Sequence, residues 1–361
     1  MSLSSRQIYW LMVSMQIVML VLLTASPAAM LAKQDAWMSA IGASLIGGAV
    51  AYMATRLSLL HPEQSFIQYT RTLLGGWAGS ALSLLYLLYW LVVFSVILRQ
   101  FASFINATIL PQTPIAFVMF MMALAVVYPT MLGITVIGRL SEVLGPIILL
   151  GVIVPILLAT NKMSPQFMLP LYGDSGLNAV FKGALPGATF LGDCFVLIML
   201  ISIVSKKEQV MRHAIGGVLT AGGGLVLTLV ACTMIFGPTV IANEPYPLLM
   251  LVRSISVGGI IENLDAIVAA IWIMSIYIKL SLYLFAASYG TMQWTGRGNW
   301  RLYVPIYASI AILIGLLPRN YVEISIVFPQ KLAIPYILPI QMVGIPLLLL
   351  IVALVRRRIA A

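Results

Sequence analysis

The chain is short of charge, of cysteine and of acidic residues in particular. Only 8% of its 361 residues are charged and 61% are hydrophobic, against roughly 25% and about 45–50% in soluble proteins. Ten acidic residues face twenty lysines and arginines, and the two cysteines, Cys194 and Cys232, both lie in apolar segments. A disulfide scaffold, a disordered chain and a soluble nucleic-acid binder are therefore excluded, and we expect the solvent of this chain to be lipid.

Apolar runs recur along the whole chain, and each is near the length of about 20 residues that a spanning helix needs. We predict an all-α membrane protein with ten transmembrane helices and no large domain outside the membrane. The first run is expected to be a transmembrane helix rather than a removed signal. The predicted spans cover residues 8–32, 36–57, 77–106, 114–133, 139–160, 183–205, 211–237, 262–292, 302–317 and 333–355.

Lysine and arginine mark the expected orientation, since cytoplasmic loops carry an excess of them. With the N-terminus in the cytoplasm, twelve fall on the inner side: Arg6, Arg56, Arg71, Arg139, Lys206, Lys207, Arg212, Arg297, Arg301 and Arg356 to Arg358. Six fall on the outer side: Lys33, Lys162, Lys182, Arg253, Arg319 and Lys331. The bias predicts that both termini are cytoplasmic. Arg99 and Lys279 remain, each inside an apolar span.

Two spans contain small residues and proline in their middle. The first has Thr24 to Pro27, and the sixth has Gly183 to Gly187 followed by Thr189 and Gly192. Glycines crowd spans two and seven, and spans three and eight are unusually long. This order occurs twice and predicts a five-plus-five inverted repeat with broken helices 1 and 6. The first repeat is expected to cover about 8–160 and the second about 183–355. The alternative is that the small residues only allow close helix packing.

Several stretches resemble a known family. They are QDAW from Gln34, LLYLLYWLVVFSVILRQFASFI from Leu84, GRLSEVLGPIILL from Gly138, KGALPGATFLGD from Lys182, and YPLLMLVRSISVGGIIENLDAIVAAIWIMSIYIKLSLYLFAAS from Tyr246. In order and spacing they resemble the spore germination permeases, the B subunits of nutrient germinant receptors, within the amino acid–polyamine–organocation superfamily. The likeness covers almost the whole chain and implies one permease-like domain over 1–361.

The resemblance also implies a LeuT-like fold in the inner membrane of the spore. It implies a receptor that binds a small nutrient, often an amino acid, in a transporter-type pocket. The partners it implies are a larger A subunit and a C lipoprotein subunit. It does not decide whether any solute crosses the protein.

In such a fold, the broken helices offer free N–H groups to a ligand carboxylate and free carbonyls to its ammonium. We therefore expect ligand contacts from helix 1 at Thr24, Ala25, Ser26 and Pro27. From helix 6 we expect them at Thr189, Phe190, Leu191 and Gly192. On helix 3, Tyr89 and Val93 share a face that Val96 and Gln100 continue. A simple kink, without ligand contact, is the alternative for each break.

Asp193 and Lys279 are ionisable groups inside apolar spans, which is costly unless they are paired or wetted. Asp193 could meet a ligand ammonium, a proton or Lys279. An ammonium facing helix 1 would stand where a transporter holds a coupling sodium ion, so we predict no sodium dependence.

The other charges have plainer expected roles. Arg99 is expected to be a structural cation paired with Glu142 or a helix-end carbonyl, and Glu142 itself has Arg139 as a local partner. Glu262 and Asp265 are expected to cap the eighth helix, and the loop from Asn243 to Pro247 could cover the pocket.

These residues bear on three candidate functions. A nutrient-sensing receptor subunit agrees with the resemblance, and a proton-coupled amino-acid transporter would share its fold and pocket. An enzyme is disfavoured because no nucleophile with a base, no catalytic residue set and no metal cluster is apparent. No cofactor, no bound metal and no nucleic-acid partner are expected.

Overall fold

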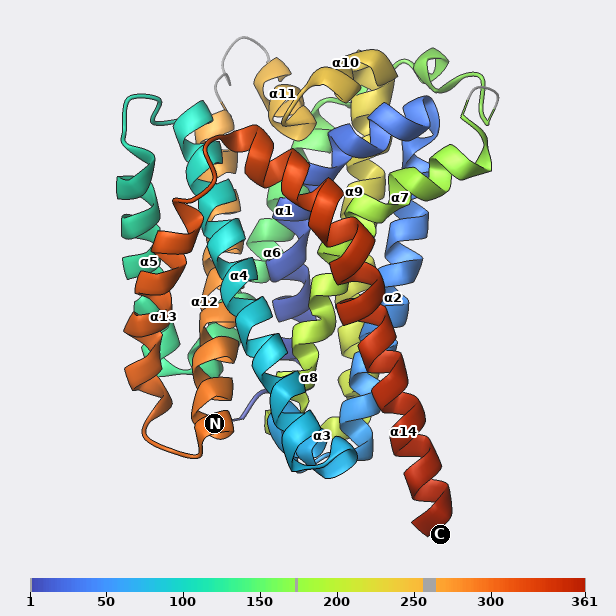
Figure 1. The fold of residues 1–361 in the computed structure, drawn as a ribbon. Helices are drawn as coiled ribbons and strands as arrows, with labels where there is room; N and C mark the ends of the chain where they lie inside the picture. Colours follow the sequence, from blue (N-terminus) through green and yellow to red (C-terminus); the bar gives the residue numbers. More distant parts are fainter. Residues whose placement is uncertain (1, 173–174, 256–263, 361) are drawn as a thin grey trace.

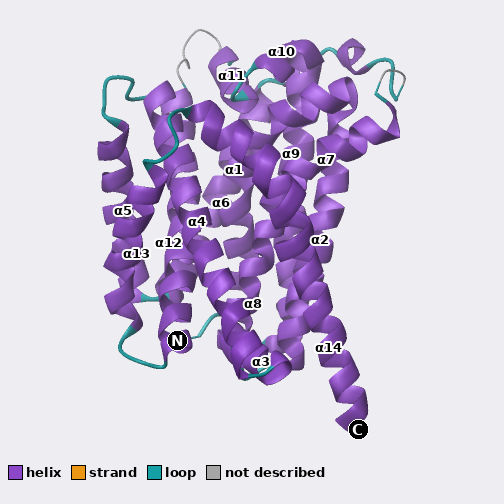
Figure 2. Cartoon of the chain, in the orientation of Figure 1, coloured by secondary structure: helices purple, strands orange, loops and turns teal. Residues whose placement is uncertain are grey.

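The computed structural model describes residues 2–172, 175–255 and 264–360, except for the side chains of 358–360. Over these residues the regular structure is helical, apart from one isolated β-bridge between Leu3 and Val204. The helices run side by side as a bundle, and both termini lie at the same end of it (Figures 1 and 2). We call the opposite end, where α10 and α11 lie, the far end.

The long elements account for the expected spans. They are α1 (Ser5–Ala32), α2 (Ala36–Leu60), α4 (Gly76–Thr108), α5 (Ile115–Leu132), α6 (Ile134–Leu158), α7 (Gly176–Gly192), α9 (Val210–Phe236), α12 (Asp265–Thr295), α13 (Trp300–Gly315) and α14 (Ile345–Ala360), the last continuing the π-helical turns η7 (Glu323–Val327) and η8 (Pro329–Gly344).

Shorter helices connect the long ones. They are η1 (Lys33–Asp35), α3 (Phe66–Leu74), η2 (Thr160–Lys162), η3 (Pro165–Met168), η4 (Asp193–Val196), α8 (Leu197–Leu200), η5 (Ile201–Ile203), η6 (Lys207–Gln209), α10 (Pro238–Asn243) and α11 (Pro247–Ser254).

Eight segments of the described chain are long and apolar enough to cross a membrane. The first, Ser5–Leu60, contains both α1 and α2 joined by η1, and α13 is a further apolar helix of 16 residues. The multi-span helical architecture is thus confirmed. The number of ten and the boundaries of the two repeats remain predictions.

Helix 1 differs from its expected form. α1 is continuous from Ser5 to Ala32, all of it described, and passes through Thr24 to Pro27 without unwinding. Pro27 lies within one and a half turns of the C-terminal end of α1, where it removes a single backbone hydrogen bond. The Thr24 hydroxyl donates back to the Leu20 carbonyl at 2.7 Å, which keeps this turn helical. The predicted break in helix 1 is therefore wrong.

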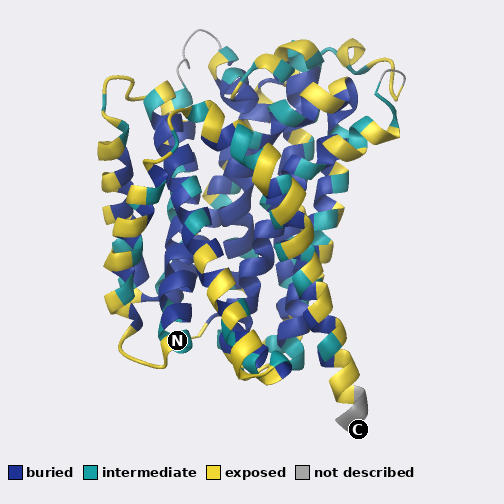
Figure 3. Ribbon diagram, in the orientation of Figure 1, coloured by how far each residue is buried: buried dark blue, intermediate teal, exposed yellow. Residues whose placement is uncertain are grey.

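The most buried part of the bundle is formed by α1 and α2 together with the sixth span. The most apolar stretch is 89% buried in both Ser5–Leu60 and Gly176–Ile203, but only 28% buried in Glu323–Arg357. Figure 3 shows this contrast between the dark centre and the exposed C-terminal helix. The core of the fold is therefore the group of helices around α1, and the C-terminal segment lies on its flank.

The glycines of α2, α7 and α9 bring these helices into close contact. A Cβ on Gly217 would lie 2.6 Å from the Tyr9 carbonyl oxygen, and one on Gly47 would lie 2.5 Å from the Leu191 Cβ. A Cβ on Gly187 would meet the Ala43 Cβ at 2.9 Å. Close approach of backbones is what small residues provide between membrane helices. The packing alternative therefore explains these glycines, including those of the Gly183–Gly187 stretch, which lies inside α7.

The first residues of the chain make contacts with two spans at the end of the bundle where the termini lie. The Leu3 N–H donates to the Ile203 carbonyl at 3.1 Å, and the Ser205 N–H donates to the Leu3 carbonyl at 3.0 Å. Arg6 forms an ion pair with Glu142. The predicted pairing of Glu142 with Arg99 is therefore wrong, because Glu142 is paired with Arg6 instead. The start of the chain thus fastens the sixth span to α6.

Asp265 is the first residue of α12, as expected, and also lies 3.3 Å from the Arg253 guanidinium. A carboxylate there complements the positive end of the helix dipole. Glu262, the other acid predicted to cap this helix, lies outside the described residues.

The contact between α9 and α2 gives a test of the packing. A Cβ on Gly222 would lie 2.1 Å from the Ser44 Oγ and 2.8 Å from its Cβ, whereas one on Gly223 would meet nothing within 4 Å. We expect Gly222→Ala to destabilise the protein by about 1–3 kcal/mol, because a well-packed contact has no room for a methyl group. Gly223→Ala, its neighbour, is the matched control and should not lower stability. Thermal unfolding of the detergent-purified variants measures both, and equal midpoints would contradict this packing.

Candidate functional site

The sixth span changes its helix type at Asp193, near the centre of the bundle. α7 ends at Gly192, and the chain continues as the 3₁₀ turn η4, the single α-turn α8 and the 3₁₀ turn η5. The irregular backbone finds partners inside the protein, as it must in lipid. The Leu191 carbonyl accepts from the Gln16 amide at 2.8 Å, and the Asp193 carbonyl accepts from the Tyr283 hydroxyl at 3.4 Å. The interruption expected in helix 6 is thus found at Gly192–Asp193.

Asp193 and Lys279 form a buried ion pair at this point. The Lys279 ammonium lies 2.8 Å from Asp193 Oδ2, and their side chains are 0% and 10% exposed. The Tyr89 hydroxyl donates to Asp193 Oδ1 at 3.2 Å, and the ammonium also lies 5.4 Å from the centre of the Phe190 ring. Both carboxylate oxygens are therefore engaged, and the pair joins α12, η4 and α4 across the core. Such a pair withstands burial only because each charge compensates the other.

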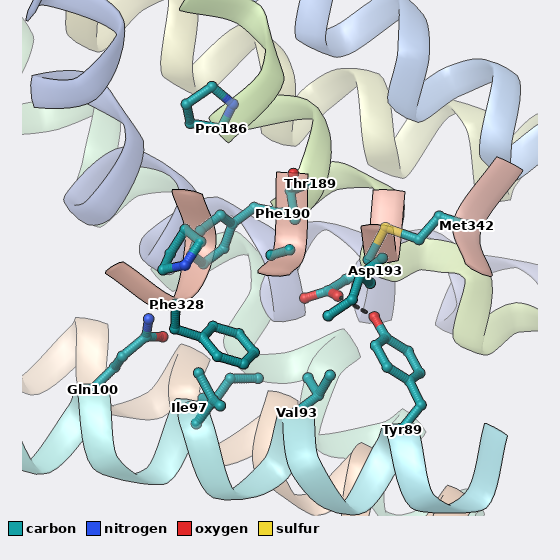
Figure 4. Close-up of a pocket in the computed structure, with 14 residues that line it drawn as sticks. Tyr89, Val93, Ile97, Gln100, Pro186, Thr189, Phe190, Asp193, Phe328 and Met342 are labelled. Atoms are coloured by element: carbon teal, nitrogen blue, oxygen red, sulfur yellow. Dashed lines mark hydrogen bonds between the residues drawn. The ribbon is translucent and has the colours of Figure 1, made fainter. Parts of the chain in front are cut away.

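A cavity opens directly beside this pair, between α4, α7 and the C-terminal segment. Its volume is about 50 Å³. Figure 4 shows the side chains of α4 on one side, those of α7 and η4 on another, and Phe328 and Met342 closing it. The lining consists of Tyr89, Val93, Val96, Ile97, Gln100, Pro186, Thr189, Phe190, Asp193, Phe328, Pro329, Ala333, Ile337 and Met342.

The α4 side of this cavity is formed by the residues that helical spacing places on one face. Tyr89, Val93, Val96 and Gln100 all line it, each three or four residues after the last. The Gln100 amide also donates to the Ile324 carbonyl at 3.4 Å, which fixes η7 against α4.

The structure brings six of the predicted ligand-contacting residues together. The cavity is lined by Tyr89, Val93, Thr189, Phe190 and Asp193. Lys279 lies outside the lining and contacts the Asp193 carboxylate.

The other six predicted residues do not line this cavity. Leu191 packs against Gly47, and Gly192 packs against Met342, whose sulfur a Cβ would meet at 2.5 Å. Thr24, Ala25, Ser26 and Pro27 are also absent from the described lining. The Ser26 hydroxyl instead donates to the Ala242 carbonyl at 3.0 Å. Because α1 stays helical here, its backbone groups are bonded within the helix and offer nothing to a ligand.

Sequence reasoning missed the wall formed by the C-terminal segment. Phe328, Pro329, Ala333, Ile337 and Met342 come from a span that begins about ten residues earlier than predicted. The available signal was a group of prolines in an apolar run, at positions 329, 335, 339 and 346. These interruptions resemble those that drew attention to helices 1 and 6. A π-helical stretch, often found at functional sites, could not have been inferred from them.

The cavity is small and mostly apolar. Sites for drug-sized molecules measure about 300–1,000 Å³, so about 50 Å³ corresponds to a closed arrangement. A ligand larger than a few atoms requires one wall to move outward. The polar groups that could receive a ligand are concentrated at one end, where Asp193, Tyr89 and Thr189 meet.

Solved structures of transporters share this fold. MhsT in complex with L-phenylalanine aligns with a TM-score of 0.63 and 14% identity, covering 98% of this chain and 89% of that one. Mhp1, a nucleobase-cation-symport-1 family transporter in a closed conformation with bromovinylhydantoin bound, aligns with a TM-score of 0.57 and 11% identity, covering 88% and 72%. At these identities the likeness shows the fold alone. The chain has the LeuT-like transporter fold.

Sequence relatives come from spore-forming bacteria. Spore germination protein KB of Bacillus subtilis (strain 168) is 24% identical over 325 residues, which cover 89% of this chain and 86% of that protein. Spore germination protein XB of Bacillus anthracis is 26% identical over 290 residues, 79% of each chain. Spore germination protein YndE of B. subtilis is 22% identical over 293 residues, 80% and 77%.

The family described as spore germination protein matches residues 2–324. That range contains α1 to α13 and the first residues of η7, including Asp193, Lys279 and the α4 side of the cavity. The chain therefore belongs to the spore germination protein family.

Proposed function

We propose that this protein is the membrane-embedded nutrient-sensing subunit of a spore germinant receptor. It resides in the inner membrane of the spore with both termini in the cytoplasm. It binds a small germinant, an amino acid, in the central cavity and thereby triggers germination. A larger A subunit and a C lipoprotein subunit are its partners, and no catalytic step is part of its role. Family membership supports this proposal, together with relatives named as spore germination proteins.

The single observation that carries the choice of ligand is the buried Asp193–Lys279 pair at the edge of the cavity. A zwitterion carries the same two charges as this pair. An amino acid entering the cavity can offer its ammonium to Asp193. Once the pair separates, its carboxylate can take the place of Asp193 beside Lys279, which lies behind the lining, so that no buried charge is left unpaired. Tyr89 then holds the carboxylate of Asp193, and Val93, Thr189 and Phe190 contact the ligand side chain. MhsT, which has the same fold, is described in complex with an amino acid.

Signalling follows from the closed cavity. Because the ligand needs more room than about 50 Å³, binding favours arrangements in which the C-terminal wall has moved away from α4. A ligand shifts such an equilibrium only by its difference in affinity for the two arrangements. The partner subunits respond to the changed population of the two arrangements.

The cavity face of α4 supplies a direct test. We expect Val93→Trp to abolish the germination response, with the response lowered at least tenfold, because the indole fills the space beside Asp193. Val92, one residue earlier, is absent from the lining and partly exposed, so Val92→Trp is the matched control and should respond normally. Spores carrying each variant are screened with the twenty common L-amino acids by loss of absorbance, and receptor levels are compared in spore membranes. A normal response of Val93→Trp at normal receptor level would place the ligand elsewhere.

The ion pair is tested by neutralising its members singly and together. Lys279→Met or Asp193→Asn alone leaves an uncompensated charge or polar group in the core, and we expect Lys279→Met to cost about 3–5 kcal/mol. The double variant should recover most of that loss, measured as the unfolding midpoint of the purified protein. If the pair is purely structural, spores with the stable double variant should still germinate in response to germinant. If the pair binds the ligand, the double variant should be stable but spores carrying it should not respond.

The second candidate function is proton-coupled amino-acid transport, which the same buried carboxylate and ammonium favour. Uptake of labelled amino acids into proteoliposomes, with and without a pH gradient, separates the two functions. We expect ligand binding without saturable uptake. Replacing sodium with choline should leave binding unchanged, since the Lys279 ammonium supplies a fixed positive charge next to Asp193. Uptake driven by the gradient would establish the transporter, and binding that rises with sodium would refute the role given to Lys279.

A further inference from the structure

A second cavity lies at the far end of the bundle. Its volume is about 530 Å³, and it is bounded by the end of α4, the loop that leads into α5 and the turn before η7. None of its described lining residues borders the central cavity. Polar side chains predominate in its lining, among them two arginines, Arg99 and Arg319. It is therefore a separate site with a different chemistry.

Arg99 is a buried cation for which the described part of the chain supplies no ion-pair partner. It is 6% exposed in the apolar helix α4, and its Nε has no hydrogen-bond partner. Among the described residues, no carboxylate lies within 4.0 Å of its guanidinium. Glu142, the partner that sequence suggested, is held by Arg6 and Gln7. A buried charge with an unsatisfied donor is costly, so this arrangement favours an external anion as the missing partner.

The described groups around Arg99 do not supply that partner. Glu323 acts on Arg99 electrostatically, but its carboxylate accepts from the Arg319 backbone N–H at 2.7 Å and so holds the turn before η7. Burial raises the pKa of Tyr321, so its phenol adds no negative charge to the cavity. The described lining holds two arginines and no carboxylate. Glu244, which acts electrostatically on Tyr321, lines the neighbouring hollow together with Arg253.

The two arginines approach the cavity from different elements. Arg99 comes from within the bundle, with Ser103 one turn further along the same face of α4, and Arg319 comes from the exposed rim. A guanidinium presents its N–H donors as a planar fork that matches the oxygens of a carboxylate or a phosphate.

We propose that this far-end cavity binds a small oxyanion, a carboxylate or a phosphate, between Arg99 and Arg319. The site differs from the germinant pocket proposed above and does not depend on it. Because η7 lies between the two, with Gln100 bonded to Ile324, an anion here also rests against the segment that closes the central cavity.

A reporter cysteine measures the charge at the edge of this cavity. Cys194 and Cys232 are both fully buried, so a thiol placed at the exposed lining residue Ala107 is the one that reacts. Ala107 also borders the neighbouring hollow lined by Glu244 and Arg253, so variants of Arg99 and Arg319 assign the signal to this cavity. Ala107→Cys is labelled in detergent-purified protein with an anionic and with a cationic methanethiosulfonate, and the ratio of the two rates is recorded. Gln166→Cys, exposed at the far end on η3 and outside the lining, is the matched control thiol.

We expect the ratio of anionic to cationic labelling to be roughly tenfold higher at position 107 than at position 166. Arg99→Gln and Arg319→Gln should each lower it several-fold, whereas Lys331→Gln, which removes a charge outside the lining, should not. Arg319 is exposed, so its variant keeps the test available if Arg99→Gln does not fold. A ratio insensitive to both arginines overturns the proposal.

Occupancy is then tested by protection. Acetate, sodium phosphate and sodium chloride are compared at equal ionic strength for their ability to slow labelling at position 107. Acetate or phosphate should protect several-fold more than chloride at low millimolar concentration, and the stronger of the two identifies the source of the oxyanion. Protection should be lost in Arg99→Gln and retained in Val93→Trp, which separates this site from the central pocket. Equal effects of all three salts would show screening alone and overturn the proposal.

Discussion

The ion pair between Asp193 and Lys279 is the interaction on which the centre of this protein depends. A carboxylate and an ammonium in an apolar bundle must meet, because either charge alone would cost several kcal/mol. Their contact at 2.8 Å draws α12 against the sixth span at the point where that span leaves the α-helical form. The Tyr89 hydroxyl brings α4 to the same carboxylate. The site is thus built by charge compensation, and the cavity lies where the three elements cannot fill the space between them.

Glycine contacts make this central position possible. Gly47 of α2 admits Leu191, Ser39 of α2 lies against Gly183, and Gly217 of α9 lies against the backbone of α1. The sixth span can therefore sit deep among α1, α2 and α9, with its irregular turns shielded from lipid. Irregular backbone at membrane depth is tolerated only in such surroundings.

Much of this architecture could be predicted from the sequence. Long apolar runs gave the spans, helical spacing placed Tyr89 and Val93 on one face, and two isolated charges in apolar spans indicated Asp193 and Lys279. The break in helix 1 could not be judged, since proline and small residues are compatible with both a continuous and an unwound helix. That Arg99 lacks an ion-pair partner among the described residues could not be predicted either, because Glu142 is paired with Arg6 from a distant part of the chain. Because Arg6 and Glu142 lie far apart in the sequence, no local sequence pattern indicates that they pair.

The C-terminal segment has the physical properties of a movable wall. Its most apolar stretch is 28% buried, against 89% for the sixth span on the other side of the cavity. Regions with few buried contacts open at the lowest free-energy cost. Its π-helical turns and prolines also leave fewer regular hydrogen bonds to break. Enlarging the central cavity by moving Phe328 and Met342 therefore costs less than displacing α4 or α7. Tyr321 at the far-end cavity and Phe328 at the central one lie seven residues apart on this wall, so a displacement that opens one cavity alters the shape of the other.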